Sequence, residues 1–243
     1  MQESVVSVRT PSGTPGLDEH MKGGFPGGSL ILVTGPPGTG KSTLGAQFLL
    51  RGLQLGNGAV LIDTCHSAET ITENAGEFRW DRNLLRKVQL IDCFNFRIGE
   101  KTGNTVHIGS FGEVIIMINE LLGTVRGPLQ SGARVVVDSF SDFILYNSLE
   151  SSLRFLQVLR TSLKHYQKNM VTTMILLECG EHDQKIIQTV EYVTDGTIKL
   201  KADDQGRYLM ISRMKSTPTQ FTWIPFRIES GAGLDITSEL YRP

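Results

Sequence analysis

The sequence predicts a three-layer α/β fold, in which helices cover both faces of a mostly parallel central sheet. Short apolar runs alternate with segments of helical spacing, as expected when each strand is followed by a crossover helix. After residue 196 the alternation stops and strand-like runs follow one another, which predicts an antiparallel β extension at the C-terminal edge. The chain has 26 glycines, against roughly 17 at usual frequency, which suits a fold with many tight turns.

Apolar runs predict the strands of this sheet, after an irregular lead-in over residues 1–29. The runs that indicate buried parallel strands cover 30–34, 59–64, 88–92, 134–138 and 171–177. Such strands are buried on both faces, so they lack the alternation of a half-exposed strand. Further runs at 197–200, 208–213 and 221–228 predict an antiparallel meander. A turn is expected at 203–206, between the first two strands of that meander.

Helical spacing of apolar residues predicts the covering helices. Leu44, Phe48 and Leu49 share one face of a helix that follows the first strand. Ser67 is the expected cap of a helix that reaches about residue 78. Further helices are expected over 111–122 and 149–169, and a loop over 95–110. At 243 residues the chain is long enough for a full core, so we expect one domain over 1–243.

Composition and charge narrow the function classes. Hydrophobic residues make up 40% and charged residues 20% of the chain, and its net charge is −1. The chain therefore has no net positive charge that would attract it to nucleic acid or to an anionic membrane. The cysteines Cys65, Cys93 and Cys179 are widely spaced, which indicates a reducing cytoplasm rather than a disulfide framework. No apolar run approaches the roughly 20 residues of a membrane helix, and no secretory signal is apparent.

Residues 35–42 carry the most informative motif, a glycine, four free positions and then Gly-Lys-Ser. This spacing lets successive backbone N–H groups point at phosphate oxygens, while the lysine neutralises the β- and γ-phosphates. A buried strand precedes the motif and a helix follows it, as a phosphate loop requires; the alternative is a glycine-rich turn between core elements. The predicted nucleotide-binding residues are Gly35, Pro36, Pro37, Gly38, Thr39, Gly40, Lys41, Ser42 and Thr43.

Asp138 is the expected partner of this loop. It closes an apolar strand nearly one hundred residues after Lys41, as a Walker B aspartate does, and a nucleotide site needs such an acid to hold Mg²⁺. The predicted metal site therefore combines the Ser42 hydroxyl with the Asp138 carboxylate. The alternative is an aspartate that caps a helix at the end of a strand.

Several segments resemble the KaiC-like branch of the RecA-type ATPases. They are 13–18 and 23–29 before the phosphate loop, then 78–81, 88–92, 135–139, 190–196 and 213–217. The Gly-Leu-Asp with Gly-Gly-x-Pro and the Glu-Tyr-Val-x-Asp-Gly segments are the more specific ones. The resemblance implies a RecA-like P-loop NTPase fold with ATP and Mg²⁺ as cofactors. It also implies a homo-oligomer, commonly a hexameric ring, with ATP between neighbours.

The resemblance assigns a role to two cations near the end of the chain. The family's Lys-x-Arg segment reaches the γ-phosphate held by the adjacent subunit, and it matches Arg213 and Lys215 here with the two cations exchanged. Either order supplies positive charge for a developing phosphate anion. Arginine is the better bidentate partner, so the exchange alters how a phosphate is gripped. The alternative is two solvated charges on an edge strand.

The chain departs from the family at the end of its second strand. Two neighbouring glutamates that activate the attacking water are replaced by Cys65 and His66. A neutral His66 could accept a proton and is the candidate base, whereas a thiol is a poor base at neutral pH. Glu69, Asp63 and Glu178 are substitute bases. A metal site at Cys65 and His66, or a merely pocket-lining role for the pair, are the other options.

Three functions remain open from the sequence. The first is an ATP-binding ring protein with a regulatory or signalling role, an unidentified protein partner and slow or absent hydrolysis. The second is a DNA-binding recombinase-like ATPase, but the loops expected at 139–152 and 178–185 are acidic, and phosphate neutralisation drives nucleic-acid affinity. The third is an autophosphorylating kinase-like protein, but no residue in the sequence supports this function.

Overall fold

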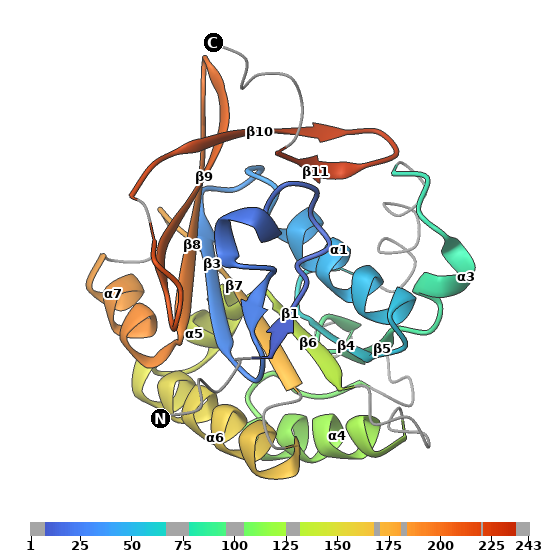
Figure 1. Cartoon of the computed structure of the whole chain (residues 1–243). Coiled ribbons are helices and arrows are strands. Elements are labelled where there is room, and N and C mark those ends of the chain that lie inside the picture. The colour runs from blue at the N-terminus through green and yellow to red at the C-terminus, as the bar shows by residue number, and fades with distance from the viewer. Residues whose placement is uncertain are drawn as a thin grey trace, which may run out of the picture.

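A computed structural model describes residues 8–66, 78–95, 105–124, 132–167, 171–180, 184–219 and 221–236. It confirms the predicted α/β architecture (Figure 1). The central sheet has nine strands in the order β11-β10-β9-β8-β3-β7-β6-β4-β5. The strands from β8 to β5 in this order are parallel, and β9, β10 and β11 continue the sheet in antiparallel pairing.

The parallel strands agree with the sequence prediction to within one residue at each end. They are β3 (Leu30–Gly35), β4 (Gly58–Asp63), β5 (Gln89–Asp92), β6 (Ala133–Asp138) and β7 (Val171–Glu178). The C-terminal part contains β8 (Gly196–Asp203), β9 (Gly206–Met214), β10 (Ile224–Glu229) and β11 (Gly233–Asp235). The predicted meander was incomplete, because β8 pairs in parallel with β3 as well as antiparallel with β9, and because β11 was not predicted.

The helices cover both faces of the sheet. They are α1 (Lys41–Gln54), α3 (Arg82–Leu85), α4 (Phe111–Thr124), α5 (Phe140–Tyr146), α6 (Leu149–Gln167) and α7 (Gln184–Val193). The lead-in contains a short ribbon of β1 (Arg9–Thr10) and β2 (Phe25–Pro26), with a 3-10 turn over Asp18–Met21 between them. Among the described residues, no helix combines the length and the apolar character needed to cross a bilayer.

Two expectations about local structure need correction, and others are untested. The loop expected over 139–152 is helical, because Ser139 accepts a hydrogen bond from Ser141 N and so starts α5, and α6 follows at Leu149. The second expected loop, 178–185, gives way to α7 at Gln184. The helix expected after Ser67, and residues 96–104 of the loop expected at 95–110, lie outside the described residues.

The core divides into two layers, one on each face of the sheet. Strand β3 shows the division, since Leu30 and Leu32 pack into the layer beneath α4 to α7, and Ile31 and Val33 into the layer beneath α1. A strand that is buried on both faces is apolar at nearly every position. This explains why the parallel strands were predictable as continuous apolar runs.

Arg134 is a fully buried cation that ties the lead-in to α1. Its Nη1 donates to Pro11 O at 2.6 Å and to Phe48 O at 2.8 Å, and its guanidinium lies 4.7 Å from the centre of the Phe48 ring. Burial lowers the pKa of Arg134 to about 10, so the side chain is charged at neutral pH. Gly52 of α1 faces this side chain, and a Cβ there would lie 2.6 Å from Arg134 Nε.

We predict that Gly52→Ala destabilises the protein. Alanine is the better helix former by about 1 kcal/mol, but Arg134 is held by its hydrogen bonds and cannot move aside, and overpacking costs about 1–3 kcal/mol. The measurement is urea unfolding. Gly112→Ala is the matched control, because a Cβ at this α4 position meets no atom within 4 Å, so this variant should be stabilised. A Gly52→Ala protein as stable as Gly112→Ala would contradict the tight contact.

Candidate functional site

The carboxyl ends of β3, β4, β6 and β7 meet at one edge of the sheet. These four strands are consecutive neighbours and parallel, so the segments that leave them converge. In parallel α/β sheets, ligands bind at this edge. The residues predicted from sequence to form the site, from the phosphate loop to Asp138, follow or end these strands.

The phosphate loop joins β3 to α1 in a closed turn. Gly38 and Gly40 have φ angles of 72° and 101°, which glycine adopts without strain. Thr39 Oγ1 donates to Pro36 O at 2.8 Å across the turn. Helix α1 begins with Gly40 at its N-cap and has no side-chain cap there. Its first backbone N–H groups therefore suit an anion.

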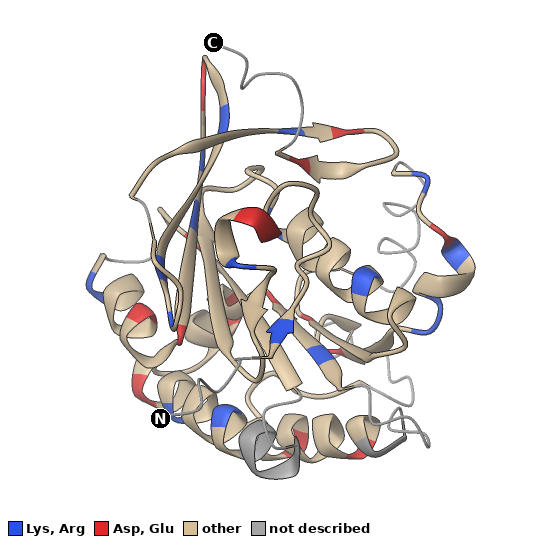
Figure 2. Cartoon of the chain, viewed as in Figure 1, with Lys and Arg blue, Asp and Glu red and all other residues tan. Residues whose placement is uncertain are grey.

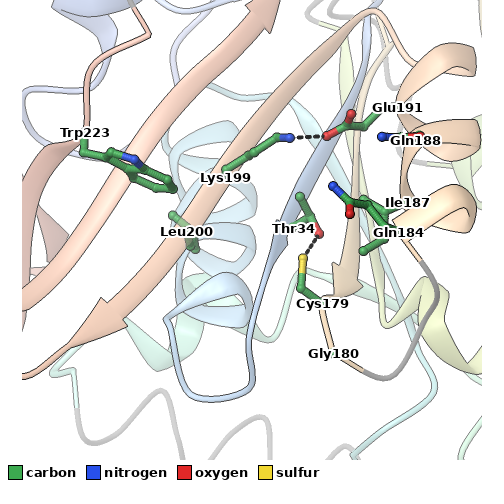
Figure 3. Close-up of a pocket in the computed structure, with 10 residues that line it drawn as sticks. All are labelled: Thr34, Cys179, Gly180, Gln184, Ile187, Gln188, Glu191, Lys199, Leu200 and Trp223. Carbon is green, nitrogen blue, oxygen red and sulfur yellow. Dashed lines mark hydrogen bonds and ion pairs between the residues drawn. The ribbon is translucent and has the colours of Figure 1, made fainter.

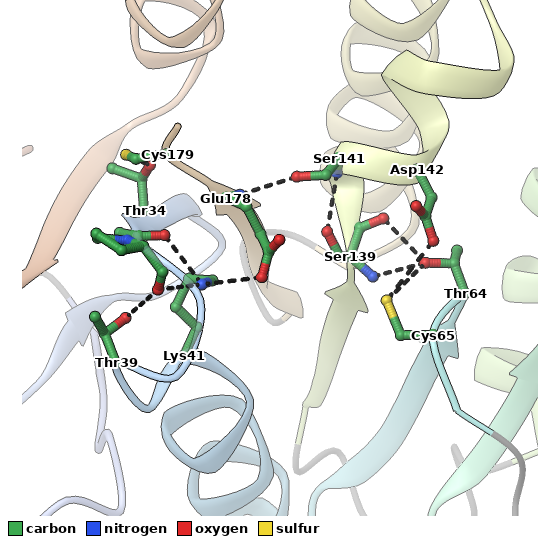
Figure 4. Close-up of polar contacts among 12 residues, drawn as sticks. Thr34, Thr39, Lys41, Thr64, Cys65, Ser139, Ser141, Asp142, Glu178 and Cys179 are labelled. Atoms are coloured by element: carbon green, nitrogen blue, oxygen red, sulfur yellow. Dashed lines mark hydrogen bonds and ion pairs between the residues drawn. The ribbon is translucent and has the colours of Figure 1, made fainter. Parts of the chain in front are cut away.

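The Lys41 side chain is folded into this loop. Only 6% of its side chain is exposed, and its Nζ lies 3.0 Å from Gly35 O and 2.9 Å from Pro36 O. Its third partner is Glu178 Oε1, at 3.4 Å, which extends from the end of β7 (Figure 4). The ammonium is thus satisfied by oxygen atoms of the protein where a phosphate would bind.

Ser42 and Asp138, the two predicted metal ligands, are brought together. The Asp138 carboxylate accepts a hydrogen bond from the Ser42 side chain. Burial raises the pKa of Asp138 to about 6, the negative charge of Asp63 adds to the rise, and Ser42, His66 and Lys41 oppose it. The capping alternative fails, because the cap of α5 is Ser139. A buried carboxylate short of positive charge, beside a hydroxyl, fits a hard cation such as Mg²⁺.

The end of β4 is organised by the Asp63 carboxylate. Its Oδ1 accepts the backbone N–H groups of Cys65 and His66 at 2.7 and 2.8 Å, and its Oδ2 lies 3.5 Å from His66 Nδ1. The hydrogen bond to Asp63 raises the pKa of His66, burial works against this, and the charges of Asp63 and Asp138 add to the rise. His66 is therefore a weaker candidate base at neutral pH than its type suggests.

Cys65 holds its proton. The residue is exposed as a whole, but its sulfur faces Thr64 Oγ1 at 3.5 Å and Asp142 Oδ2 at 3.6 Å. Burial of the thiol raises its pKa to about 12; the Thr64 hydrogen bond opposes this, and the charges of Asp138, Asp142 and Asp63 support it. Among the described residues, no cluster of three His, Cys, Asp or Glu side chains is placed to hold a metal ion.

The substitute bases are placed differently. Asp63 is engaged by the turn after β4, and Glu69 lies outside the described residues. Glu178 reaches Lys41, and its backbone N–H donates to Ser141 Oγ at 2.9 Å. The sequence pattern placed Glu178 at the polar end of an apolar strand. It did not reveal that the carboxylate pairs with Lys41, which lies 137 positions earlier in the sequence.

Arg213 and Lys215 lie away from the phosphate loop of their own chain. Arg213 pairs with Thr197 near the amino end of β8, whereas the loop leaves the carboxyl end of β3. Arg213 Nη2 donates to Thr194 O at 2.5 Å and to Glu191 O, both at the C-terminal end of α7. The predicted role of these two cations concerns a neighbouring subunit, so it stays a prediction.

Gln47 is a site-supporting residue that the sequence analysis missed. It is 4% exposed on α1, where its Nε2 donates to Ala232 O and Leu234 O at 3.0 Å and its Oε1 accepts Leu234 N at 2.9 Å. These bonds fix the β10–β11 hairpin beside the loop, where Ile228 covers Gly40. A glutamine within the apolar stripe of α1 was the available signal.

A cavity of about 430 Å³ lies between α7 and the sheet, next to the phosphate loop (Figure 3). Its lining includes Thr34, which precedes the loop, and Cys179, which follows β7; their side chains are 2.8 Å apart. Across the cavity, Lys199 Nζ of β8 lies 2.8 Å from Glu191 Oε1 of α7. Residues 35–43 are not among those that line it.

Comparison with known proteins agrees with this geometry. A family model described as the KaiC ATPase matches residues 10–241. A UPF0273 protein of Saccharolobus solfataricus is 31% identical, over 88% of this chain and 78% of its own length. The circadian clock protein KaiC2 of Synechocystis is 28% identical over a region that spans 82% of this chain and 34% of KaiC2. The crystal structure of a KaiC-like protein from Pyrococcus horikoshii superposes with a TM-score of 0.75 at 25% identity, over 95% of this chain and 99% of the other.

We predict that Asp138→Asn stabilises the nucleotide-free protein at high pH. A folded-state pKa of about 6, above the ordinary 3.8, means that stability is lost as the pH rises through this interval, by about 3 kcal/mol in full. Asparagine removes this cost, so the gain should be full at pH 8, about half as large at pH 5 and small below pH 4. Urea unfolding in EDTA measures it.

The control for this variant is Asp203→Asn, which removes one charge from the exposed β8–β9 turn. It should not reproduce the gain at pH 8. Equal stability of the wild type and Asp138→Asn at pH 8 would show that burial of the carboxylate carries no such cost.

Proposed function

Because this chain belongs to the KaiC family of RecA-like, ATP-binding proteins, we propose that it binds ATP with Mg²⁺ at residues 35–43. The convergence of Lys41, Ser42 and Asp138 at one sheet edge carries this proposal. Lys41 would balance the charge of the β- and γ-phosphates, and the loop amides would hold their oxygens. Ser42 and Asp138 would hold Mg²⁺, which when bound neutralises phosphate charge.

The proposed site is built for binding more than for turnover. At the positions of the family's glutamate pair, the Cys65 thiol keeps its proton and the His66 ring is engaged by Asp63. General-base help is worth about 10²- to 10⁴-fold in rate, or roughly 3–5 kcal/mol. Hydrolysis by this chain should therefore be slow or absent, and nucleotide occupancy itself should be the signal.

We further propose that the protein forms a ring, commonly hexameric in this family, with ATP between neighbours. Strand register supports this, since Met214 pairs with Gly196 and Gly196 with Ile31. Arg213 and Lys215 therefore lie about four strand residues, or roughly 13 Å, below the carboxyl end of β3. This position is too far for them to serve the phosphate loop of their own chain, so a role at a phosphate would be at the loop of a neighbour, and Arg213 would have to leave the two carbonyl groups at the C-terminal end of α7 to take it. The proposal includes a regulatory role with a protein partner, for which slow turnover would keep the nucleotide-bound state long-lived.

Nucleic-acid binding finds less support. The segment 139–152 after the Walker B strand contains Asp142 and Glu150 and no Lys or Arg. Figure 2 shows cations and anions interspersed over both helical layers rather than gathered into a basic face. Phosphate neutralisation by clustered cations drives affinity for nucleic acid, so the recombinase-like alternative is not favoured.

We predict that Lys41→Ala abolishes binding of ATP and ADP in the presence of Mg²⁺, as measured by titration calorimetry. The variant loses the positive charge of the loop, so affinity should fall by about 100-fold or more. Lys199→Ala is the matched control, because Lys199 also pairs with a glutamate but lies on β8 outside residues 35–43. Light scattering of the same samples should show assembly with MgATP for the wild type and the control only. Unchanged affinity in Lys41→Ala would refute the site.

We predict that the double variant Cys65→Glu with His66→Glu raises phosphate release. It restores carboxylates beside the phosphate loop, and the gain should be at least about 100-fold, the low end of what a general base supplies. Phosphate release is measured with MgATP, and the same double variant carrying Lys41→Ala accounts for contaminating activity. If release does not rise, the attacking water is activated from another position.

A further inference from the structure

The ion pair between Lys41 and Glu178 has a consequence for which nucleotide the site accepts. Glu178 is the last residue of β7, with 27% of its side chain exposed, and its Oε1 lies 3.4 Å from Lys41 Nζ. Figure 4 shows the carboxylate pointing across the mouth of the phosphate loop toward the ammonium. The same ammonium is the group that a bound nucleotide needs for its β- and γ-phosphates.

The backbone of Glu178 is fixed, so the residue cannot withdraw as a whole. It pairs with Gly35 in the sheet, and its N–H donates to Ser141 Oγ at 2.9 Å. The next residue, Cys179, donates its N–H to Gly35 O at 3.0 Å. Ser141 is in turn held at the start of α5 by Ser139 Oγ. The distance between the Glu178 carboxylate and Lys41 can therefore change by side-chain rotation but not by withdrawal of the Glu178 backbone.

An incoming phosphate must replace Glu178 at Lys41. An ammonium has three donor hydrogens, and those of Lys41 are shared among Gly35 O, Pro36 O and Glu178 Oε1. When a phosphate takes the third position, the displaced carboxylate stays within a few ångströms of it, because its backbone does not move. Two anions at that separation repel each other, and partial burial leaves the repulsion poorly screened.

We propose that Glu178 is a specificity-determining residue that selects the nucleotide by how close its dianionic terminal phosphate comes to the Glu178 carboxylate. This inference rests on the proposed nucleotide site at residues 35–43. A free γ-phosphate meets the Glu178 carboxylate, so the site disfavours metal-free ATP. ADP ends one phosphate earlier and avoids the full repulsion. Mg²⁺ held by Ser42 and Asp138 would neutralise phosphate charge, so MgATP would be accepted. The site would thereby bind the triphosphate more tightly as its metal complex than without metal.

The test compares the affinities for ATP and ADP, each in EDTA and in Mg²⁺, by titration calorimetry. In EDTA the wild type should bind ADP more tightly than ATP. Glu178→Gln keeps the shape of the side chain and removes its charge, so it should raise the affinity for metal-free ATP at least about tenfold. The gain for ADP should be less than about threefold, since its terminal phosphate lies farther from residue 178. In Mg²⁺ the gain for ATP should shrink.

Glu191→Gln is the matched control. Glu191 also pairs with a lysine, Lys199, at 2.8 Å, but it lies on α7 beside the neighbouring cavity. Its replacement should leave all four affinities unchanged. A further variant, Glu178→Asp, keeps the charge but shortens the side chain by one methylene, so its ATP-to-ADP ratio should lie between those of the wild type and Glu178→Gln. This variant decides the matter if Glu178→Gln does not fold.

The outcomes separate this inference from the function on which it rests. If the wild type binds neither nucleotide, the proposed site at residues 35–43 is wrong. If both nucleotides bind and their affinity ratio in EDTA is the same in the wild type and the Glu178 variants, the selective role is overturned while the site stands. An equal gain for ATP and ADP in Glu178→Gln also overturns it, because simple competition for Lys41 would then account for the effect.

Discussion

The buried ammonium of Lys41 is the group on which the rest of the site depends. Parallel strands bring carboxylates to the same sheet edge, of which Asp63 and Asp138 are almost fully buried and Glu178 partly so. Desolvated anions of like sign destabilise one another unless cations compensate them. Lys41 supplies one such charge, and the raised pKa of Asp138 shows that the compensation is incomplete. The uncompensated negative charge therefore favours the binding of an added cation. Functional sites commonly trade stability for binding in this way.

In the proposed function, binding and turnover would depend on different strands of the same edge. The segments after β3 and β6 carry the residues proposed to hold a triphosphate, whereas the turn after β4 has Cys65 and His66 at the positions proposed to match the family's water-activating glutamates. Asp63 uses both carboxylate oxygens to shape this turn. A protein with this division can keep nucleotide-dependent assembly when its chemical step is slow, because assembly requires only that ATP occupy the interface.

The sequence predicted the features that follow from local rules. Continuous apolar runs identified the parallel strands because both faces of those strands are buried, and glycine spacing identified the loop because the backbone there needs positive φ angles. Features set by contacts distant in sequence were missed. Helix α5 is short and begins at a serine in what looked like a loop, Glu178 finds Lys41 only in the folded sheet, and Arg213 meets the end of α7 across a strand register that no local pattern encodes.

If Arg213 acts in the proposed ring, its position would link assembly to the stability of α7. Its guanidinium donates to Thr194 O and to Glu191 O at the end of this helix, where Thr194 Oγ1 also donates to Glu191 O. A role at a neighbour's phosphate would require Arg213 to give up these contacts, and the helix end would lose a favourable cation. The Lys215 side chain makes no hydrogen bond or ion pair among the contacts of the described residues, and the residue is exposed. In the proposed ring, the exchanged order of the two cations would therefore make Lys215 the more readily extended of the pair, and Arg213 would bind a phosphate only if that contact were stronger than its contacts with the end of α7.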